Sequence, residues 1–585
     1  MLRWGENKLI LEEALIGAAI AAAVAFLLVL AVLPDYAFRL GVYRVMALAG
    51  WPVHPDIVAY SQQHRLLASA GVVLPIGAGL VAAVWAFIAL GWQRQEWTWQ
   101  GMEFEADPES FGPRLAAHER ALYSPAQAEA VRTRAPAPRG VRIGGVELSR
   151  TREVSHLAVY GLPGAGKTVL LRGLLRQALE RGDRVLLHDP KGDFLDALAG
   201  PDSAEAVVVL GPWDARARPW DIAADIGTPE RAVAFAGAIF GAGEGPNKFF
   251  VDAARETLAG VIKHLQRRQP GAWGWADLAD ILEGGNEAIL GAAWDGEPAV
   301  RALVRDPSSR QTDGVLGEIV SAANWIPAYA RAFGPEAQPF SVARWLIDPG
   351  PVRAVVLNSD ARYSVRGEQL FGAMLAAAAA TVSSPAMRER GADEPGYWLL
   401  IDELPQLGPA AQRAVTTIEE MGRSRGVRVV KAMQDPSQLD ARAGREQATA
   451  QRAVQQTRIY LKLAPASAAE ISQQLGHRDI RRVELPQVVG AGNKRVVKDT
   501  APVIRAEDLM ASRRLPHGVE AVVHIDDLIG RLVQPFVPLP GGAGAMIPNP
   551  RWDTLAPSRT MPVSPPAPAE PPAPAAKSDT DIFDF

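Results

Sequence analysis

The chain has 585 residues, of which 48% are hydrophobic, so it can bury the cores of several domains. Its formal net charge of −4 excludes a globally basic nucleic-acid binder, and any contact with DNA must come from a local basic patch or a pore made by several subunits. The absence of cysteine excludes disulfides and thiolate metal sites, and the 9 scattered histidines give no reason to expect a transition metal.

Two charge-free apolar stretches predict a membrane anchor at residues 1–98. The first runs from Ala14 to Leu33, the second covers about 66–92, and about 20 such residues cross a bilayer as a helix. A cleaved signal peptide is the alternative for the first stretch. The two acidic residues directly before it, Glu12 and Glu13, and the lack of a clear small-residue cleavage site argue against that alternative.

The charges around the two spans are too evenly distributed to fix the orientation of the anchor. A nucleotide site, described next, requires cytoplasmic ATP, so we expect the large C-terminal part in the cytoplasm and a periplasmic loop at 34–65. The aromatic side chains of this loop could contact membrane partners, or the loop could be an ordinary interfacial one. These side chains are Tyr36, Phe38, Tyr43 and Trp51.

Residues 99–150 are mixed and polar, and we interpret them as a juxtamembrane stalk that ends in a short strand pair at Val141–Ile143 and Val146–Leu148. After them, the apolar run Leu157–Tyr160 predicts a buried strand, and the apolar spacing after Thr168 predicts a helix up to Gly182.

Between this strand and this helix lies a phosphate-binding loop of the form G-x-x-x-x-G-K-[ST]. Its glycines let backbone N–H groups point at phosphate oxygens, and the helix N-terminus adds partial positive charge. Lys167 would reach the β- and γ-phosphates of ATP, and the Thr168 hydroxyl would bind Mg²⁺. The nucleotide-binding residues are therefore predicted to be Gly161, Leu162, Pro163, Gly164, Ala165, Gly166, Lys167 and Thr168.

A second buried strand, Arg184–His188, ends in the polar run Asp189–Asp193, at the edge where α/β sheets place their ligand contacts. Residues 228–343 then show helical spacing and few alternating β-branched residues, so we expect an all-α domain inserted into the sheet domain. The sheet domain itself is predicted to comprise 151–227 and 344–534.

The sheet resumes with a strand at Arg353–Leu357, a helix at Gly367–Thr381 and the apolar run Tyr397–Ile401, which ends in Asp402 and Glu403. An apolar strand followed by Asp-Glu, downstream of a phosphate loop, is the Walker B pattern. Asp402 would orient the Mg²⁺ shell, and Glu403 would orient and deprotonate the attacking water. The additional strand between the two motifs is typical of RecA-like motor ATPases.

A helix at Ala410–Met421 and a strand at Val427–Met433 follow. Gln434, at the end of this strand, could sense the γ-phosphate or the attacking water, or could merely satisfy the strand end. Arg423, just before the strand, could act across a subunit boundary on transition-state charge. It could equally be an edge arginine paired with a carboxylate.

One more strand at Thr457–Leu463 and a helix at Ala466–Leu475 complete the predicted motor. A basic cluster then falls in a stretch that we expect to be rich in turns, where it could line a channel or could be an ordinary solvated loop: Arg481, Arg482, Lys494, Arg495 and Lys498. Residues 535–585 are rich in Pro and Ala and are predicted to be disordered. The acidic and aromatic tip, 578–585, could dock into a partner.

In this order, the spans and motifs resemble the type IV secretion coupling proteins of the TraD/TraG type, over about Ala14 to Val523. The resemblance implies a RecA-like hexamer in the bacterial inner membrane that uses ATP to move DNA, with its relaxase, into a type IV conjugation channel. It also implies that Lys167, Glu403, Arg423 and Gln434 are catalytic, with Arg423 as a trans arginine finger and Gln434 as a sensor.

Two other functions stay open. The chain could be a receptor for the DNA–relaxase substrate that uses ATP as an assembly switch, although a pure switch does not need Glu403. It could also be an FtsK-like DNA translocase, although two predicted spans and the lack of a predicted folded domain after Val523 count against that.

Overall fold

The computed structural model describes residues 19–29, 35–93, 96–135, 139–198, 205–241, 243, 245–348, 350–435, 455–484, 495–538 and 541–555. They form two compact units. The smaller unit contains the chain up to Glu105 together with Ala468–Asp508 and Asp527–Ile529, and the larger unit contains Ala106–Ser467, Leu509–Asp526 and the chain from Gly530 onward.

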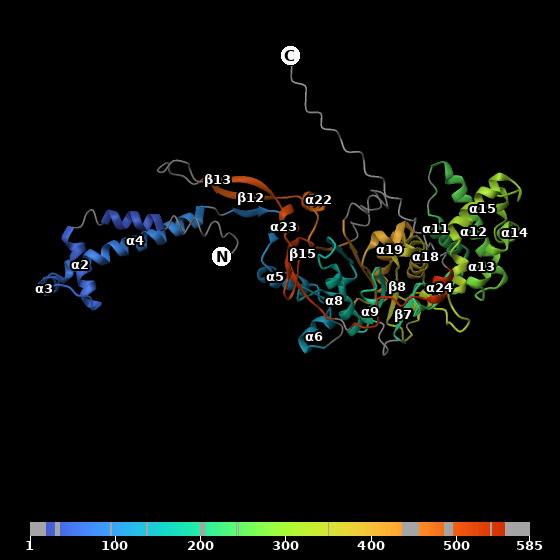
Figure 1. The fold of residues 1–585 in the computed structure, drawn as a ribbon, viewed down its shortest axis with the longest axis horizontal. Coiled ribbons are helices and arrows are strands. Elements are labelled where there is room, and N and C mark those ends of the chain that lie inside the picture. The colour runs from blue at the N-terminus through green and yellow to red at the C-terminus, as the bar shows by residue number, and fades with distance from the viewer. Residues whose placement is uncertain are drawn as a thin grey trace, which may run out of the picture. The chain divides into compact units, whose positions relative to one another are not determined.

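The N-terminal part of the smaller unit is helical (Figure 1). A short apolar helix, Ala19–Val29, is followed by α2 (Asp35–Leu48), α3 (Pro55–Gln63) and α4 (Arg65–Gln93). Among the described residues, α4 is the one helix long and apolar enough to cross a membrane, with a mean hydropathy of 2.1 over Arg65–Val84. The first predicted span, 14–33, lies only partly within the described residues, so an anchor of two spans stays a prediction.

The segment 34–65, predicted as the periplasmic loop between the two spans, contains the helices α2 and α3. Its helical structure follows from close packing of α2 on α4. A Cβ added to Gly41 would lie 2.4 Å from the Ala68 carbonyl oxygen, and one added to Gly71 would lie 2.2 Å from that of Ala37. Such an approach needs small residues on both helices, and the spacing of Ala37 and Gly41 places them on one face of α2.

The smaller unit also contains an antiparallel sheet in the order β1 (Glu96–Gln100), β12 (His477–Glu484), β13 (Arg495–Pro502). The prediction of a turn-rich stretch around the basic cluster is therefore wrong for the described part, because Arg481 and Lys498 are paired residues of a hairpin. Both strands contain many charged residues and few apolar ones. The sequence therefore lacks the regular alternation of apolar and polar residues by which a strand is recognised. Lys494 lies outside the described residues.

The larger unit is built on a twisted sheet with strand order β16-β15-β11-β5-β10-β9-β6-β8-β7, in which the seven strands from β11 to β7 are parallel. Antiparallel strands flank it beyond β11. The bounds are β5 (Leu157–Tyr160), β6 (Arg184–Asp189), β7 (Val207–Leu210), β8 (Ala354–Asn358), β9 (Tyr397–Ile401), β10 (Val427–Met433), β11 (Thr457–Tyr460), β14 (Arg514–Leu515), β15 (Gly518–Ile525) and β16 (Leu528–Pro535). Every strand predicted from an apolar run is present; β7, β14, β15 and β16 were not predicted.

The direction of the crossovers decides which face each helix covers. The chain moves from β5 to β6 through α8 (Lys167–Glu180) in one direction along the sheet. It returns in the opposite direction, from β8 to β9 through α18 (Ser364–Val382) and from β9 to β10 through α19 (Gly408–Gly422). Because such crossovers are right-handed, α8 covers one face, and α18 and α19 cover the opposite one.

Between β7 and β8, the described residues are helical, apart from turns and isolated bridges. The helices are α10 (Ile222–Asp225), α11 (Pro229–Phe240), α12 (Lys248–Arg268), α13 (Trp275–Glu283), α14 (Gly285–Gly296), α15 (Arg310–Ala323), α16 (Ile326–Arg331) and α17 (Val342–Ile347). In Figure 1, α11 to α15 lie together in the helical bundle to the right, whereas α17 packs on α18.

This helical insertion packs on α18, where the Gln369 amide donates to the Ile239 carbonyl of α11 at 2.8 Å, and its two ends meet at a neck. Its two ends lie side by side, because Phe340 N–H donates to the Pro219 carbonyl at 2.8 Å and Asp221 N–H donates to the Phe340 carbonyl at 2.9 Å. The buried carboxylate of Asp225 accepts hydrogen bonds from the start of α17, including the Val342 N–H at 3.0 Å.

The remaining described elements of both units are short. They are β2 (Phe104–Glu105), α5 (Pro108–Ala121), α6 (Pro125–Thr133), β3 (Arg142–Ile143), β4 (Val146–Glu147), α7 (Arg150–Glu153), α9 (Leu195–Leu198), α22 (Pro465–Leu475), α23 (Ala506–Met510) and α24 (Pro550–Leu555).

The prediction that the chain is disordered from residue 535 onward is wrong for 541–555. This segment, here called the C-terminal strap, lies along the sheet edge at β7. The Ala215 N–H donates to the Ile547 carbonyl at 2.7 Å, and the Asn549 N–H donates to the Trp213 carbonyl at 2.9 Å. Trp552 is fully buried against Trp213, with 6.1 Å between ring centroids. A single large aromatic can thus anchor a Pro- and Gly-rich segment. Residues 556–585, with the predicted docking tip, lie outside the described residues.

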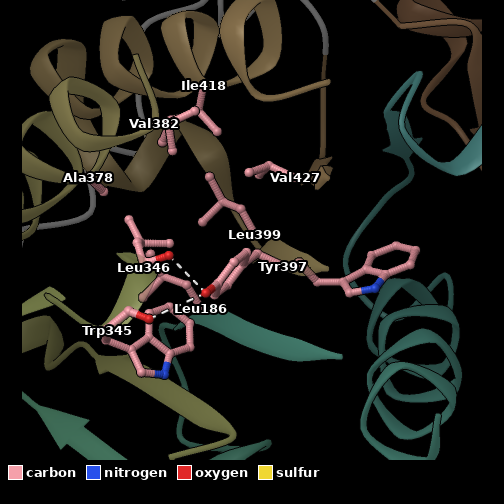
Figure 2. Close-up of a pocket in the computed structure, with 10 residues that line it drawn as sticks. Leu186, Trp345, Leu346, Ala378, Val382, Tyr397, Leu399, Ile418 and Val427 are labelled. Atoms are coloured by element: carbon pink, nitrogen blue, oxygen red, sulfur yellow. Dashed lines mark hydrogen bonds between the residues drawn. The ribbon is translucent and has the colours of Figure 1, made fainter. Parts of the chain in front are cut away.

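A small apolar cavity of about 20 Å³ lies between the sheet and the helices α17, α18 and α19 (Figure 2). Its side chains include Leu186 and Leu399 of the sheet, Ala378 of α18 and Ile418 of α19, and the Tyr397 hydroxyl beside it donates to the Leu346 carbonyl at 2.8 Å. A space of this size and polarity holds about one water at most, so it is a packing defect of the core and no binding site.

Candidate nucleotide site

The phosphate loop connects β5 to α8 as predicted and is held on both sides by neighbouring strands. The Gly161 N–H donates to the Met433 carbonyl at 3.1 Å, and the Leu162 N–H donates to the Lys462 carbonyl at 2.9 Å. Gly164 and Gly166 have φ values of 76° and 105°, which a residue with a side chain rarely adopts. The loop is therefore a preformed cradle of backbone N–H groups at the N-terminus of a 14-residue helix.

Lys167 and Thr168 are the first two residues of α8. The Lys167 ammonium donates to the Gly161 carbonyl at 2.7 Å, inside the curve of the loop. Burial lowers the pKa of Lys167, while the nearby carboxylates Glu403 and Asp402 act in the opposite direction. A phosphate group carries more negative charge than the Gly161 carbonyl oxygen. A bound phosphate would therefore replace that oxygen as the partner of the Lys167 ammonium.

Asp402 and Glu403 directly follow β9 and are both buried. Burial raises the pKa of Asp402 to about 6 and also raises the pKa of Glu403. One oxygen of each, Asp402 Oδ1 and Glu403 Oε1, is buried and has no hydrogen-bond partner among the described residues. Buried carboxylate oxygens without donors are costly unless a cation or water binds them.

Gln434 follows β10, and its amide donates to Glu403 Oε2 at 3.2 Å. The structure thus brings Gln434 and Glu403 together at adjacent strand ends. This hydrogen bond orients the carboxylate toward the region between the two strands and the phosphate loop.

Arg423 lies at the opposite end of β10, before its first residue, and is exposed. Seven strand residues separate it from Gln434, which corresponds to roughly 20 Å at about 3.3 Å per residue. Among the described residues it makes no ion pair with a carboxylate, so the alternative of a paired edge arginine has no support there. Arg423 cannot reach the nucleotide site of its own chain.

The helix α19, which leads from the Glu403 region to Arg423, is fixed on β10 by a buried ion pair. The Lys431 ammonium donates to Glu419 Oε2 at 2.8 Å, and both side chains are fully buried. His156 adds a second link, since its Nε2 lies 2.8 Å from the Glu419 carbonyl oxygen and its Nδ1 accepts from the Val429 N–H. Burial lowers the pKa of His156 to about 4, so the ring is neutral.

Asp189, at the end of β6, was noted in the sequence but not predicted as a site residue. Its neighbour His188 is in register with Ile401, so the Asp189 and Asp402 side chains follow adjacent strand ends. Burial raises the pKa of Asp189 to about 6, its Oδ2 accepts from the Phe194 and Leu195 N–H groups, and its Oδ1 has no partner among the described residues. Its place at a carboxyl strand end beside the Walker B strand is the signal that could have found it.

These residues fit a nucleotide with Mg²⁺. The loop offers N–H donors and Lys167 for the phosphates, and Thr168 and Asp402 offer oxygens for the ion. No group of three or more His, Asp or Glu side chains in the described parts of the chain is arranged to hold a metal alone. Mg²⁺ would therefore share its coordination with phosphates and water, as is usual for this ion.

A parallel sheet with a phosphate loop after one strand and an acidic pair after a non-adjacent strand defines a P-loop protein of the RecA-like class with a helical insertion. The type IV secretion-system coupling protein DNA-binding domain family matches residues 140–523. The chain belongs to this family.

Relatives agree with this assignment. The coupling protein TraD of Escherichia coli (strain K12) is 24% identical over 208 residues, which are 35% of this chain and 28% of that protein. The chain therefore matches little more than a quarter of that relative's length. The solved structure of the bacterial conjugative coupling protein TrwBdeltaN70, in its unbound monoclinic form, has a TM-score of 0.61 at 20% identity and covers 78% of this chain and 97% of its own. The plasmid coupling protein TrwB in complex with ADP and Mg²⁺ has a TM-score of 0.59 at 20% identity, covering 78% and 98%. These structures show a shared fold.

Proposed function

We propose that this chain is a membrane-anchored ATPase that recruits a DNA–relaxase substrate and drives DNA transfer through a type IV conjugation system. The observation that carries the proposal is the contact between Glu403 and Gln434, at 3.2 Å, beside a preformed phosphate loop. Family membership, and the complex of the similarly folded TrwB with ADP and Mg²⁺, support the choice of nucleotide and reaction class.

In this proposal, each residue has a role set by its position. The loop N–H groups and Lys167 bind the phosphates, and Thr168 and Asp402 hold Mg²⁺, which when bound neutralises phosphate charge. Glu403 accepts a proton from the attacking water, and its raised pKa makes it a stronger base than an exposed glutamate. Gln434 keeps the Glu403 carboxylate in the productive orientation.

Arg423 is proposed to complete the site of a neighbouring subunit. It lies too far from its own site, is exposed, and is fixed through α19 and β10 to the elements that carry Glu403 and Gln434. A ring of identical subunits, a hexamer in our proposal, would place it against the next nucleotide, where a guanidinium stabilises charge in the transition state.

We also propose that the protein is held in the inner membrane by two helices, α4 and the region around Ala19–Val29, with the larger unit in the cytoplasm. The length and mean hydropathy of α4 support the second span. Type IV channel proteins of the inner membrane, DNA and relaxosome proteins are the partners that this placement would serve.

The test is Glu403→Gln in the full-length protein, purified in detergent. ATP hydrolysis, with and without DNA, should fall by about 10²–10³-fold, since the water loses its base, while binding of ATP stays within a few-fold. Glu420→Gln, on the exposed face of α19, is the matched control and should hydrolyse ATP normally.

The same variants distinguish a motor from a receptor with an ATP switch. A Glu403→Gln strain should lose DNA transfer although the protein is present and binds ATP. Normal transfer by that strain would refute the motor function and favour the receptor.

A further inference from the structure

The loop between β6 and α9, residues 190–194, is built against the phosphate-loop helix. The Asp189 carboxylate, just before the loop, accepts hydrogen bonds from the Phe194 N–H at 2.9 Å and the Leu195 N–H at 2.8 Å, which join the two ends of the loop. Arg172, on the second turn of α8, donates to the Asp193 carbonyl at 3.1 Å. The loop therefore has a fixed position relative to the helix whose N-terminus faces the phosphates.

The C-terminal strap holds the same loop from the other side. Gly192 has a φ of 73°, and a Cβ there would lie 2.3 Å from the Ala545 carbonyl oxygen. Asp196 Oδ1 accepts from the Gly542 N–H at 3.1 Å and the Gly544 N–H at 2.7 Å. A segment more than 300 residues away in sequence is thus packed on the loop next to the nucleotide site.

Arg216 and Trp552 fix the strap in turn. The Arg216 guanidinium donates to the Ala543 and Gly544 carbonyls, both at 2.9 Å, and is itself held by Asp214 at 2.7 Å. Trp552 fills a buried position against Trp213 and Tyr363. The strap is therefore a built part of the fold, with both polar and apolar anchors.

Lys191 is the one basic side chain of this loop. It is exposed and makes no ion pair with a described residue. Burial raises the pKa of Asp402 and Glu403 and lowers that of Lys167, and the positive charge of Lys191 lowers the pKa of all three to a smaller extent. An exposed cation on the loop that follows the strand next to Asp402 and Glu403 is available to bind an anion.

The order of the strands indicates which phosphate of ATP Lys191 would contact. The phosphate loop follows β5, Gln434 follows β10, Glu403 follows β9, and Lys191 follows β6, in that order along the edge. One strand spacing of about 4.8 Å separates β6 from β9, and an extended lysine side chain spans roughly 6 Å, so Lys191 can reach the space in front of Glu403. Lys191 thus follows the strand next to Glu403, on the side where the attacking water and the terminal phosphate of ATP would bind.

We propose that Lys191 binds the terminal phosphate of ATP and that the C-terminal strap, through Gly192 and Asp196, positions it. The inference rests on the proposed ATPase function. It assigns to the chain a second phosphate-binding lysine in addition to Lys167, and it makes recognition of ATP over ADP depend on a segment near the C-terminus.

The test measures nucleotide affinity in the full-length protein in detergent, with a fluorescent non-hydrolysable ATP analogue and with fluorescent ADP. Lys191→Met should weaken binding of the ATP analogue by about 10-fold and leave ADP within about 2-fold, since ADP lacks the phosphate concerned. Lys191→Arg should keep most of the affinity for the ATP analogue. Arg176→Met, which removes an exposed cation from α8, is the matched control and should change neither.

Asp196→Ala tests the strap. It should shift the ratio of the two dissociation constants in the same direction, with faster amide hydrogen exchange in 190–195, because the loop loses its outer support. A purely structural role would lower Tm and leave that ratio unchanged, which would overturn the positioning part of the proposal. Equal weakening of both nucleotides in Lys191→Met, or no weakening, would overturn its binding role. Wild-type protein that binds both nucleotides but does not hydrolyse ATP would refute the ATPase function alone.

Discussion

At the scale of single residues, the edge of the sheet at the nucleotide site carries several buried carboxylates. Asp189, Asp402 and Glu403 each leave one buried oxygen without a partner among the described residues, and burial raises the pKa of all three. Without nucleotide and Mg²⁺, this edge therefore destabilises the fold. Ligand binding offsets that cost, so we expect Mg²⁺ and nucleotide together to raise Tm.

Asp189→Asn should stabilise the nucleotide-free protein in a pH-dependent way. The folded-state pKa of Asp189 is about 6 against an ordinary 3.8, so the cost of its charge develops as pH rises from about 4 through 6 and is complete above that. Asn keeps an oxygen for the Phe194 and Leu195 N–H groups but carries no charge. The difference in Tm between variant and wild type, measured without Mg²⁺, should be about half as large at pH 5 as at pH 7.5, where it corresponds to at most about 3 kcal/mol. A difference independent of pH would contradict this assignment.

At the scale of elements, α19 is fixed on β10 by charge. The buried face of α19 carries the negative charge of Glu419, which Lys431 of β10 neutralises. Lys431 and Glu419 are both fully buried, and burial raises the pKa of Glu419 and lowers that of Lys431, so each side chain depends on its partner to stay ionised. Breaking such a pair costs more than replacing it, because the remaining charge has no counterion.

Lys431→Met should therefore destabilise the protein by about 3–5 kcal/mol, whereas the double variant Lys431→Met with Glu419→Leu should recover much of that loss. Urea unfolding of the two variants measures both effects. Arg425→Met, which removes a partly buried cation that donates to the Met387 carbonyl at the same end of α19, is a control for loss of a single arginine contact. A double variant as unstable as Lys431→Met would show that the two side chains do not act as a pair.

Local patterns explain why the elements around the nucleotide could be predicted and others could not. The phosphate loop, Asp402, Glu403 and Gln434 each follow a buried parallel strand that is continuous in apolar residues, so their position at one edge follows from the sequence alone. The hairpin β12–β13 has charged residues along both strands, and only its backbone pairing reveals it. The strap was missed because prolines and glycines dominate 538–550, and its order depends on Trp552 and Asp196, which are too far apart in sequence to be connected before the fold is known.

At the scale of the whole molecule, the separation of Arg423 from its own nucleotide site predicts sites shared between subunits. Arg423→Ala protein should be inactive, and so should Glu403→Gln protein. Co-assembled rings of the two should regain part of the ATP hydrolysis, because some interfaces combine an intact Glu403 with an intact Arg423. Co-purified mixed rings in detergent provide the measurement, and Arg425→Ala in place of Arg423→Ala is the control. Mixed rings without any recovered activity would contradict a role of Arg423 in trans.

The last residues, 578–585, give a prediction that is independent of the motor. Removing them should weaken recruitment of the DNA–relaxase substrate, because acidic and aromatic side chains on a long tether suit a basic pocket with an apolar floor. ATP hydrolysis should remain unchanged, since the strap at 541–555 stays intact. Conjugation frequency and ATPase rate in the same deletion strain test both parts, and unchanged transfer would refute the docking role.

The neck of the helical insertion has a consequence for how such proteins diversify. Because Pro219, Asp221 and Phe340 are joined by backbone hydrogen bonds, the chain enters and leaves the insertion at nearly the same point. Beyond the neck, the insertion also contacts the sheet domain through α11, whose Ile239 carbonyl accepts from the Gln369 amide, and through Ala332, whose carbonyl accepts from Asn549 of the strap. We therefore expect that the insertion can be exchanged as a unit at the neck only where the residues that contact α18 and the C-terminal strap are kept.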